Sequence, residues 1–278
     1  MAGGRPIDHV VLAVQDLDRT AVIYQELGFT LTPKAAHEDR MGTSNRLAQF
    51  GARNFIELLE VDRPETLAQH NFAASPPFFS FGDHNRQAVL EREGLSMLAF
   101  ASDDARADVS GFRAARLPTF APFYFERHAK LPDGARVTLA FLLAFVQSKE
   151  MPRVAFFVCQ NRAQDNFWKP EYQSHANGAA GIVAVYLSSP APERDAAFVS
   201  KMFGGNVSPA RGGFVVACGP SQELRVLTPQ AMAERDSPAG AGTAAPALVG
   251  IALATHEKRG LIPSAKASGM FIEWVSET

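Results

Sequence analysis

The stretch Ile7-Asp-His-Val-Val-Leu-Ala-Val14 decides the fold. Its run of apolar and β-branched residues is typical of a β-strand. Directly after it, Asp18 is a candidate N-cap, and apolar residues recur at helical spacing until Gly28 ends the helix. A strand followed at once by a short amphipathic helix begins a supersecondary unit.

The residues after this helix complete the unit with three more strand patterns. Residues 29–32 resume a strand pattern, and two longer strand patterns follow at 46–50 and 54–60. The first 60 residues therefore predict one β-α-β-β-β unit, with its helix between the first and second strands.

The same order of elements returns twice along the chain, which indicates internal repeats. We therefore predict an α+β fold in which repeated βαβββ modules form cupped, mostly antiparallel sheets with helices outside. A generic α+β protein with strands after helices is the alternative. The further strands are predicted at 96–102, 120–127, 135–146, 153–159, 181–188, 213–217, 223–227, 248–254 and 270–275.

These repeats divide the chain into two parts. Residues 1–178 should hold two paired modules, about 7–60 and 95–160, with a helical insertion at 61–94. Residues 179–278 should hold a third module with degenerate C-terminal strands.

Composition excludes several classes of protein. The 27 basic and 29 acidic residues nearly cancel and form no basic block, so we expect no nucleic-acid partner. Two cysteines, Cys159 and Cys218, are too few for a disulfide framework. The N-terminus lacks the apolar stretch of a secretory signal, and no apolar run approaches the ~20 residues that cross a bilayer. We expect a cytoplasmic protein that does not bind membranes.

Two polar side chains lie on otherwise apolar strand faces. Alternation places His9 with apolar neighbours on one face of the first strand, and Glu57 likewise on the strand at 54–60. Burying a carboxylate costs several kcal/mol unless a cation or donor compensates it. A divalent metal shared with His9 would do so, and imidazole with carboxylate suits iron, manganese, nickel or zinc. Alternatively, His9 caps a sheet edge and Glu57 pairs with Arg53 or Arg46.

The motifs around these residues resemble a known superfamily. Asp8-His-Val-Val-Leu-Ala-Val-Gln-Asp-Leu-Asp18, then Leu27-Gly-Phe29 and Phe55-Ile-Glu-Leu-Leu59, look like the opening module of the vicinal-oxygen-chelate superfamily. Segments 37–46 and 168–178 resemble its glyoxalase-like branch. The resemblance implies that His9 and Glu57 are metal ligands.

The second module departs from this superfamily pattern. Alignment places Ser96 opposite His9 and Phe157 opposite Glu57, so two of the usual four ligand positions carry no strong ligand. A third ligand could come from His175 or His37, which both lie in loops beside the motifs. Either would complete a two-histidine, one-carboxylate set with open positions for substrate.

Other polar and aromatic residues near the motifs predict a substrate pocket. Asn45 and Arg46 could bind a carboxylate, and the aromatic residues could line an apolar cleft or simply pack in the core. The candidate substrate-binding residues are Asn45, Arg46, Trp168, Tyr172 and Asn177.

Two functions follow from these expectations. One is a metal-dependent enzyme, a lyase, isomerase or dioxygenase, that acts on a small oxygenated molecule. The other is a metal-free protein that sequesters a small apolar or aromatic compound. No general base can be assigned. The superfamily often pairs modules between chains, so a homodimer is possible.

Overall fold

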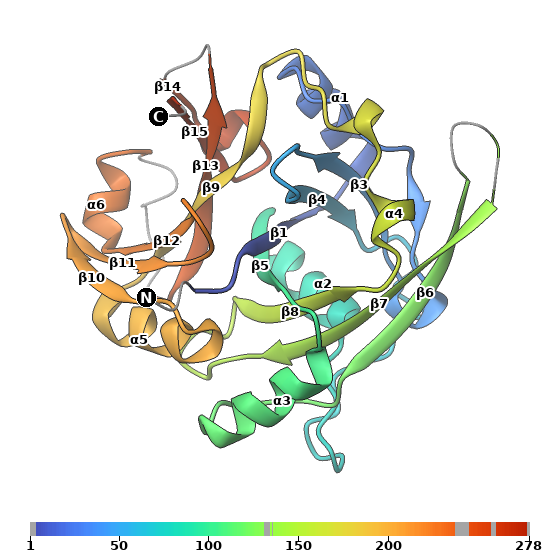
Figure 1. Cartoon of the computed structure of the whole chain (residues 1–278), viewed down its shortest axis with the longest axis horizontal. Helices are drawn as coiled ribbons and strands as arrows, with labels where there is room; N and C mark the ends of the chain where they lie inside the picture. The colour runs from blue at the N-terminus through green and yellow to red at the C-terminus, as the bar shows by residue number, and fades with distance from the viewer. Residues whose placement is uncertain (1–3, 131–133, 135, 237–244, 257–259, 277–278) are drawn as a thin grey trace.

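The protein is built around two strongly curved β-sheets (Figure 1). The computed structural model describes residues 4–130, 134, 136–236, 245–256 and 260–276. In the first sheet the strands lie in the order β2-β3-β4-β1-β5-β8-β7-β6. Their bounds are β1 Ile7–Val14, β2 Ala35–Ala36, β3 Ser44–Gln49, β4 Phe55–Glu60, β5 Gly94–Ala101, β6 Phe123–Lys130, β7 Arg136–Val146 and β8 Ala155–Asn161.

The second sheet repeats this architecture with the C-terminal residues. Its strands lie in the order β10-β11-β12-β9-β13-β15-β14. Their bounds are β9 Ala179–Ser188, β10 Val207–Ala210, β11 Gly213–Ala217, β12 Glu223–Leu227, β13 Ala247–Thr255, β14 Gly260–Ile262 and β15 Phe271–Ser276.

Each half of a sheet is one module, recognised by its parallel pair of first and last strands. In the first sheet β1 pairs in parallel with β4, and β5 with β8. Antiparallel pairing of β1 with β5 joins the two modules into one cup. In the second sheet β9 and β13 make the same junction. The predicted α+β fold of cupped, mostly antiparallel sheets is therefore confirmed.

Two local predictions are wrong. Residues 29–32 form no strand, although the Thr32 amide bonds to the Leu47 carbonyl oxygen; the second strand of the module is instead the two-residue β2. The N-cap of the first helix is Asp16, whose carboxylate accepts from the Arg19 amide at 2.8 Å, and not Asp18. Asp18 lies in the first turn and faces Arg46 at 3.1 Å, so a cross-element ion pair replaces the expected cap.

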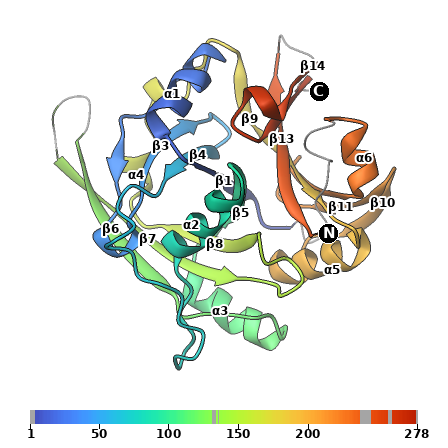
Figure 2. The same cartoon turned by 180° about the vertical axis from the view of Figure 1, so that it is seen from behind.

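One helix from each of the first three modules packs on the outer, convex face of a sheet (Figures 1 and 2). The insertion at 61–94 contributes a further helix, α2, which packs against β1 and β5. Among the described residues that follow β13 there is no α-helix. The helices are α1 Leu17–Glu26, α2 Phe81–Glu91, α3 Ala105–Ala114, α4 Gln164–Phe167, α5 Pro192–Phe203 and α6 Pro229–Ala233, with 3-10 turns at η1 Asp39–Met41, η2 Pro170–Tyr172 and η3 Ser264–Lys266.

The largest hydrophobic core is shared by the two sheets. In β1, Val10 and Leu12 point into this core, whereas Val11 points into a separate cluster inside the first cup. Asn54 links the halves, since its side-chain amide donates to the Ile182 carbonyl at 3.0 Å and accepts from the Ile182 amide at 2.9 Å. The shared core therefore fixes the convex faces and leaves the concave faces to hold a site.

The two concave faces differ in what they hold. That of the second sheet is occupied by its own side chains, with Tyr186 packed on Phe271 and bonded by Arg225 at 2.7 Å. Arg235 pairs with Glu273 at 3.0 Å there, so opposite charges compensate each other. The first sheet carries ionisable groups around a cavity, and its cup is therefore the better place to look for function.

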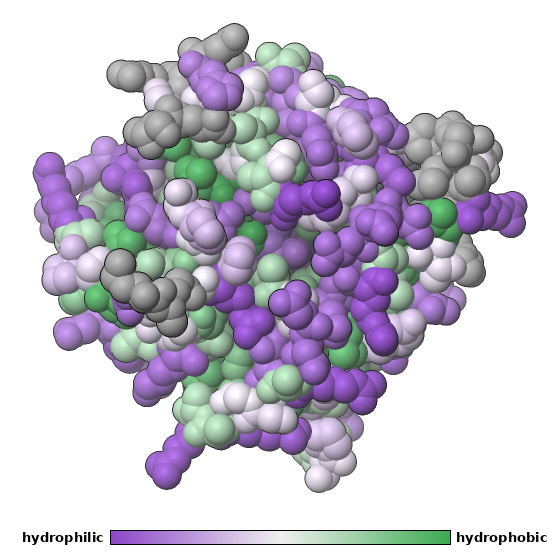
Figure 3. Space-filling view, viewed as in Figure 1, coloured by the Kyte–Doolittle hydropathy of each residue, from purple (hydrophilic) through white to green (hydrophobic). Residues whose placement is uncertain are grey.

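The described surface offers no second candidate for a functional site. On the face seen in Figure 3, hydrophilic and hydrophobic residues are interspersed among the coloured atoms. Large exposed apolar side chains such as Phe72 and Leu90 are scattered over different elements. None of the described helices is long and apolar enough to span a membrane.

Candidate functional site

His9 and Glu57 meet on the concave face of the first sheet. They project from the adjacent parallel strands β1 and β4, and each side chain is only 6% exposed. The Nε2 atom of His9 lies 3.8 Å from Oε2 of Glu57. The His9 ring stacks on Phe55 with centroids 4.3 Å apart, which fixes its orientation.

His37 approaches the same carboxylate from the loop between β2 and β3. Its Nε2 atom lies 3.7 Å from Oε1 of Glu57, so each carboxylate oxygen faces one imidazole. Its Nδ1 atom is 2.8 Å from the Thr43 hydroxyl. Arg63 donates to the carbonyl oxygens of His37 and Thr43 at 3.1 and 2.9 Å, and thereby holds this loop in place.

Gly42 shapes the loop that carries His37. It has φ +63°, and an added Cβ would lie 2.6 Å from the Arg63 carbonyl oxygen and 2.8 Å from Leu67 Cβ. We expect Gly42→Ala to destabilise the protein by about 2 kcal/mol, because both the left-handed backbone and the contact are unfavourable. Denaturant unfolding checks this. Gly51→Ala, where a Cβ meets nothing within 4 Å, is the matched control and should change stability by less than about 0.5 kcal/mol.

Asn45 supports the carboxylate from β3. Its Nδ2 atom donates to Oε1 of Glu57 at 2.6 Å and lies 3.2 Å from Nε2 of His37. Its Oδ1 atom is buried and has no hydrogen-bond partner among the described residues. A buried acceptor without a donor is costly, so this oxygen is available to a ligand in the site.

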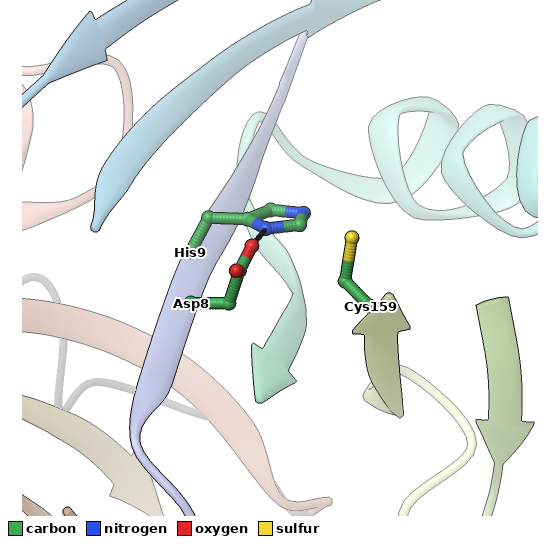
Figure 4. Close-up of side chains that lie close together, drawn as sticks. All are labelled: Asp8, His9 and Cys159. Atoms are coloured by element: carbon green, nitrogen blue, oxygen red, sulfur yellow. Dashed lines mark hydrogen bonds and ion pairs between the residues drawn. The ribbon is translucent and has the colours of Figure 1, made fainter. Parts of the chain in front are cut away.

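Asp8 and Cys159 also lie near the His9 ring (Figure 4). Oδ1 of Asp8 is 2.5 Å from Nδ1 of His9, and one donor atom from each of Asp8, His9 and Cys159 lies within 4.8 Å of the others. A carboxylate at one imidazole nitrogen is the usual arrangement when the other nitrogen binds a metal. Asp8, His9 and Cys159 therefore form an alternative set of metal donors to His9, His37 and Glu57.

Burial controls the protonation of these groups. It raises the pKa of Glu57, while His9, the Asn45 hydrogen bond and Arg127 lower it. The pKa of His37 lies well below its ordinary value, chiefly because of burial and then because of Arg127 and Arg63. His37 is therefore neutral and can offer a lone pair. Burial raises the pKa of the Cys159 thiol well above its usual range, which makes it a poor metal donor.

The groups border a cavity of about 40 Å³. A volume of that size holds roughly three water molecules. Apart from the polar groups, its wall is mostly aromatic, and one cation, Arg127 of β6, reaches it. The aromatic wall consists of Phe55, Phe81, Phe125, Phe141, Phe157 and Phe167.

Ser96 and Phe157, which sequence alignment places opposite His9 and Glu57, offer no strong ligand to the cavity. Ser96 is buried, and its hydroxyl donates a hydrogen bond to Oδ1 of Asn85 in α2 at 2.6 Å. Phe157 lines the cavity and meets His9 edge-on with centroids 5.3 Å apart. The polar side of the cavity therefore comes mainly from the first module.

Two of the other predicted residues lie away from the cavity. Arg46 turns toward Asp18 and the Thr32 carbonyl oxygen. His175 accepts from the Thr30 amide at 3.0 Å through Nδ1, and its Nε2 atom lies 2.7 Å from the Gln49 carbonyl oxygen. Both ring nitrogens of His175 are thus engaged by the backbone.

The remaining predicted substrate residues also lie outside the cavity lining. Asn177 donates to the Leu27 carbonyl oxygen at 3.0 Å and accepts from the Ala179 amide at 3.0 Å. Trp168 packs on Phe55, with centroids 5.9 Å apart, and borders a separate depression that also contacts Asp8 and Cys159. Tyr172 lies in the partly exposed turn η2. Of the five, Asn45 alone lines the cavity around His9 and Glu57.

Sequence reasoning missed Arg127, Asp8 and Cys159. Arg127 shares strand alternation with Phe123 and Phe125, which was a usable signal for an inward position. Asp8 stands beside His9, but alternation alone places it on the opposite face; a register irregularity between Ile7 and His9 accompanies its contact with the ring.

Thr43 gives a test of how His37 is held. If His37 is a metal ligand, as the sequence analysis offers, Thr43→Val should weaken metal binding by about 10–100-fold, because it removes the hydroxyl at Nδ1 while keeping the side-chain shape. Titration of the metal-free protein with Mn²⁺ or Zn²⁺ measures this. An unchanged affinity together with an unchanged fold would contradict a ligand role for His37.

A cup of paired βαβββ modules, with a buried histidine on its first strand and a buried glutamate on its fourth, defines a protein of the vicinal-oxygen-chelate superfamily. More narrowly, the chain belongs to the glyoxalase-like domain family, whose model matches residues 7–203. No curated protein matches it.

Solved structures share the fold at low sequence identity. A hypothetical protein from Staphylococcus aureus is 14% identical with a TM-score of 0.74, over 98% of this chain and 99% of that one. A Mn(II)-bound glyoxalase from Novosphingobium aromaticivorans is 13% identical with a TM-score of 0.55, over 99% and 83%. A mutant 4-hydroxymandelate synthase from Streptomyces coelicolor is 12% identical with a TM-score of 0.56, over 99% and 93%.

Proposed function

We propose that the protein is a metal-dependent enzyme of the vicinal-oxygen-chelate type, which uses His9, His37 and Glu57 to hold a divalent ion. One observation carries this proposal: the Nε2 atoms of two buried imidazoles face the two oxygens of one buried carboxylate, at 3.8 and 3.7 Å. The other nitrogen of each imidazole contacts an oxygen, from Asp8 or Thr43. Without a metal, this carboxylate is a costly charge to bury.

The donor set fits such an ion. Nitrogen and oxygen ligands bind a divalent metal at about 2.0–2.2 Å, so two ligands of one ion lie at most about 4.4 Å apart. Both separations from Glu57 are below that limit. Two histidines and one carboxylate suit iron, manganese, nickel or zinc and leave positions open. The Mn(II)-bound glyoxalase of similar fold makes manganese the first ion to test.

The chain's own residues would prepare the site in distinct ways. Asp8 and Thr43 orient the two imidazoles, and Asn45 orients the carboxylate through its amide. The phenylalanine side chains make most of the cavity wall apolar, which lowers the local dielectric constant and strengthens electrostatic interactions there. A bound divalent ion would supply Lewis acidity, stabilising negative charge that develops on an oxygen of a small oxygenated substrate.

A metal-free binding protein is the second candidate function. It is supported by the aromatic lining and by Phe157 at the position opposite Glu57. Metal analysis of protein purified without an affinity tag, followed by reconstitution with Mn²⁺, Fe²⁺, Ni²⁺ and Zn²⁺, separates the two. We expect one equivalent of bound metal. Failure of every ion to bind would overturn the enzyme proposal and favour sequestration.

A further inference from the structure

Arg127 brings a positively charged side chain to a cavity whose other lining residues are the polar groups around Glu57 and a mostly aromatic wall. It lies on β6, opposite Leu139 of β7, and shares a face of the strand with the buried residues Phe123 and Phe125. No hydrogen bond or ion pair joins its guanidinium to another of the described residues, although Glu57 lies close enough to influence its charge. A partly buried guanidinium of this kind has donors left for a ligand.

The charges around the cavity favour an anionic ligand. With the divalent ion of the proposed function in place, the ion and Arg127 bring positive charge to a cavity whose lining holds one carboxylate among the described residues, that of Glu57. An anionic ligand would offset the remaining positive charge, which lowers the cost of burial. A neutral ligand would leave a net positive charge among phenylalanine side chains.

The shape of the guanidinium and the size of the cavity narrow the class of anion. A guanidinium presents a planar fork that matches a carboxylate. The cavity of about 40 Å³ is far smaller than the ~150 Å³ that encloses benzene, so only a few non-hydrogen atoms fit inside it. The unpartnered Oδ1 of Asn45 can accept a hydrogen bond from a hydroxyl of the ligand.

We propose that Arg127 determines substrate class by binding the carboxylate of a small 2-hydroxy or 2-oxo acid, whose second oxygen lies toward His9, His37 and Glu57. This inference rests on the proposed function for the position of the metal. The anion site itself is a property of this chain's own side chains and can be measured with and without metal.

The test compares glycolate with glycolamide, its neutral counterpart of similar shape. Calorimetric or NMR titration is done on the metal-free and the Mn²⁺-treated protein, for wild type, Arg127→Gln and Arg127→Lys. We expect wild type to prefer glycolate by at least about tenfold, Arg127→Gln to lose this preference, and Arg127→Lys to keep part of it. Arg136→Gln, an exposed arginine of the neighbouring strand β7, is the matched control and should keep the full preference.

The outcomes separate the two proposals. A preference for glycolate that persists in folded Arg127→Gln, or that is absent in wild type, overturns the anion site. A protein that takes up no metal, but whose preference still depends on Arg127, supports the anion site and contradicts the proposed enzyme. Thermal melting of each variant identifies any that fails to fold, and for such a case Arg127→Lys and Arg127→Met carry the comparison.

Discussion

His9→Ala should reduce the affinity for a divalent metal by at least about 100-fold, because it removes the imidazole whose Nε2 atom faces Glu57. The metal-free variant should lose only about 1 kcal/mol of unfolding free energy, since His9 lies in the cup and not in the core shared by the two sheets. Metal content after dialysis and chemical denaturation of the metal-free protein give the two numbers. An unchanged metal content would rule His9 out as a ligand.

A buried histidine outside the cavity provides the control for this change. His175→Gln removes a ring whose nitrogens contact the backbone of Thr30 and Gln49. It should lower stability and leave metal content unchanged. If both histidine variants lose metal in proportion to their stability, the loss reports unfolding and not the removal of a ligand.

His9 also belongs to the competing donor set with Asp8 and Cys159, and a second pair of variants separates the sets. Cys159→Ala should keep the metal, because the Cys159 thiol stays protonated in its buried position. Glu57→Gln should weaken metal binding while keeping the side-chain volume. The reverse result would place the ion between Asp8, His9 and Cys159.

The fold could be predicted because its signals are local and repeated. The strand at Ile7–Val14, the helix after it and the later copies of the same order all indicated one module. What failed was determined by contacts between elements. Residues 29–32 make a single backbone hydrogen bond with β3 and form no strand. Asp18 forms an ion pair with Arg46 and does not cap the helix.

The site could be predicted only in part, for a similar reason. His9 and Glu57 lie on predicted strands whose alternation points them inward. Asn45, a predicted substrate-binding residue just before the predicted strand at 46–50, lies on β3, and the structure brings all three together. His37 and His175 lie in loops, whose side chains have no periodicity to orient them. The sequence left both open as a third ligand, and only the fold shows that His37 faces Glu57 whereas His175 bonds to the backbone.

The cost of burying Glu57 leads to a prediction about the metal-free protein. Burial raises the pKa of Glu57 above its value in the unfolded chain. The folded state therefore favours protonated Glu57, and this contribution to the free energy of unfolding is lost as the pH rises from the unfolded-state pKa through the folded-state pKa. The metal-free wild type should become less stable over this pH range. Glu57→Leu, which has no ionisable group at this position, should lack this part of the pH dependence.

Without metal, Glu57→Leu should therefore be more stable than wild type, and wild type alone should gain stability when metal is added. Burying a polar group without full compensation costs about 1–3 kcal/mol, and Glu57→Leu removes this cost, while Asn45 keeps its contact with His37 after the change. With metal at about 100 times its dissociation constant, wild type gains about 2.7 kcal/mol that the variant cannot gain. Melting temperatures at neutral pH, measured with chelator and with Mn²⁺, check this. The variant should have the higher melting temperature without metal, and only wild type should gain stability from Mn²⁺. A metal-free Glu57→Leu that is less stable than wild type would mean that the protein donors around Glu57 compensate its charge fully, and that the site does not need a metal.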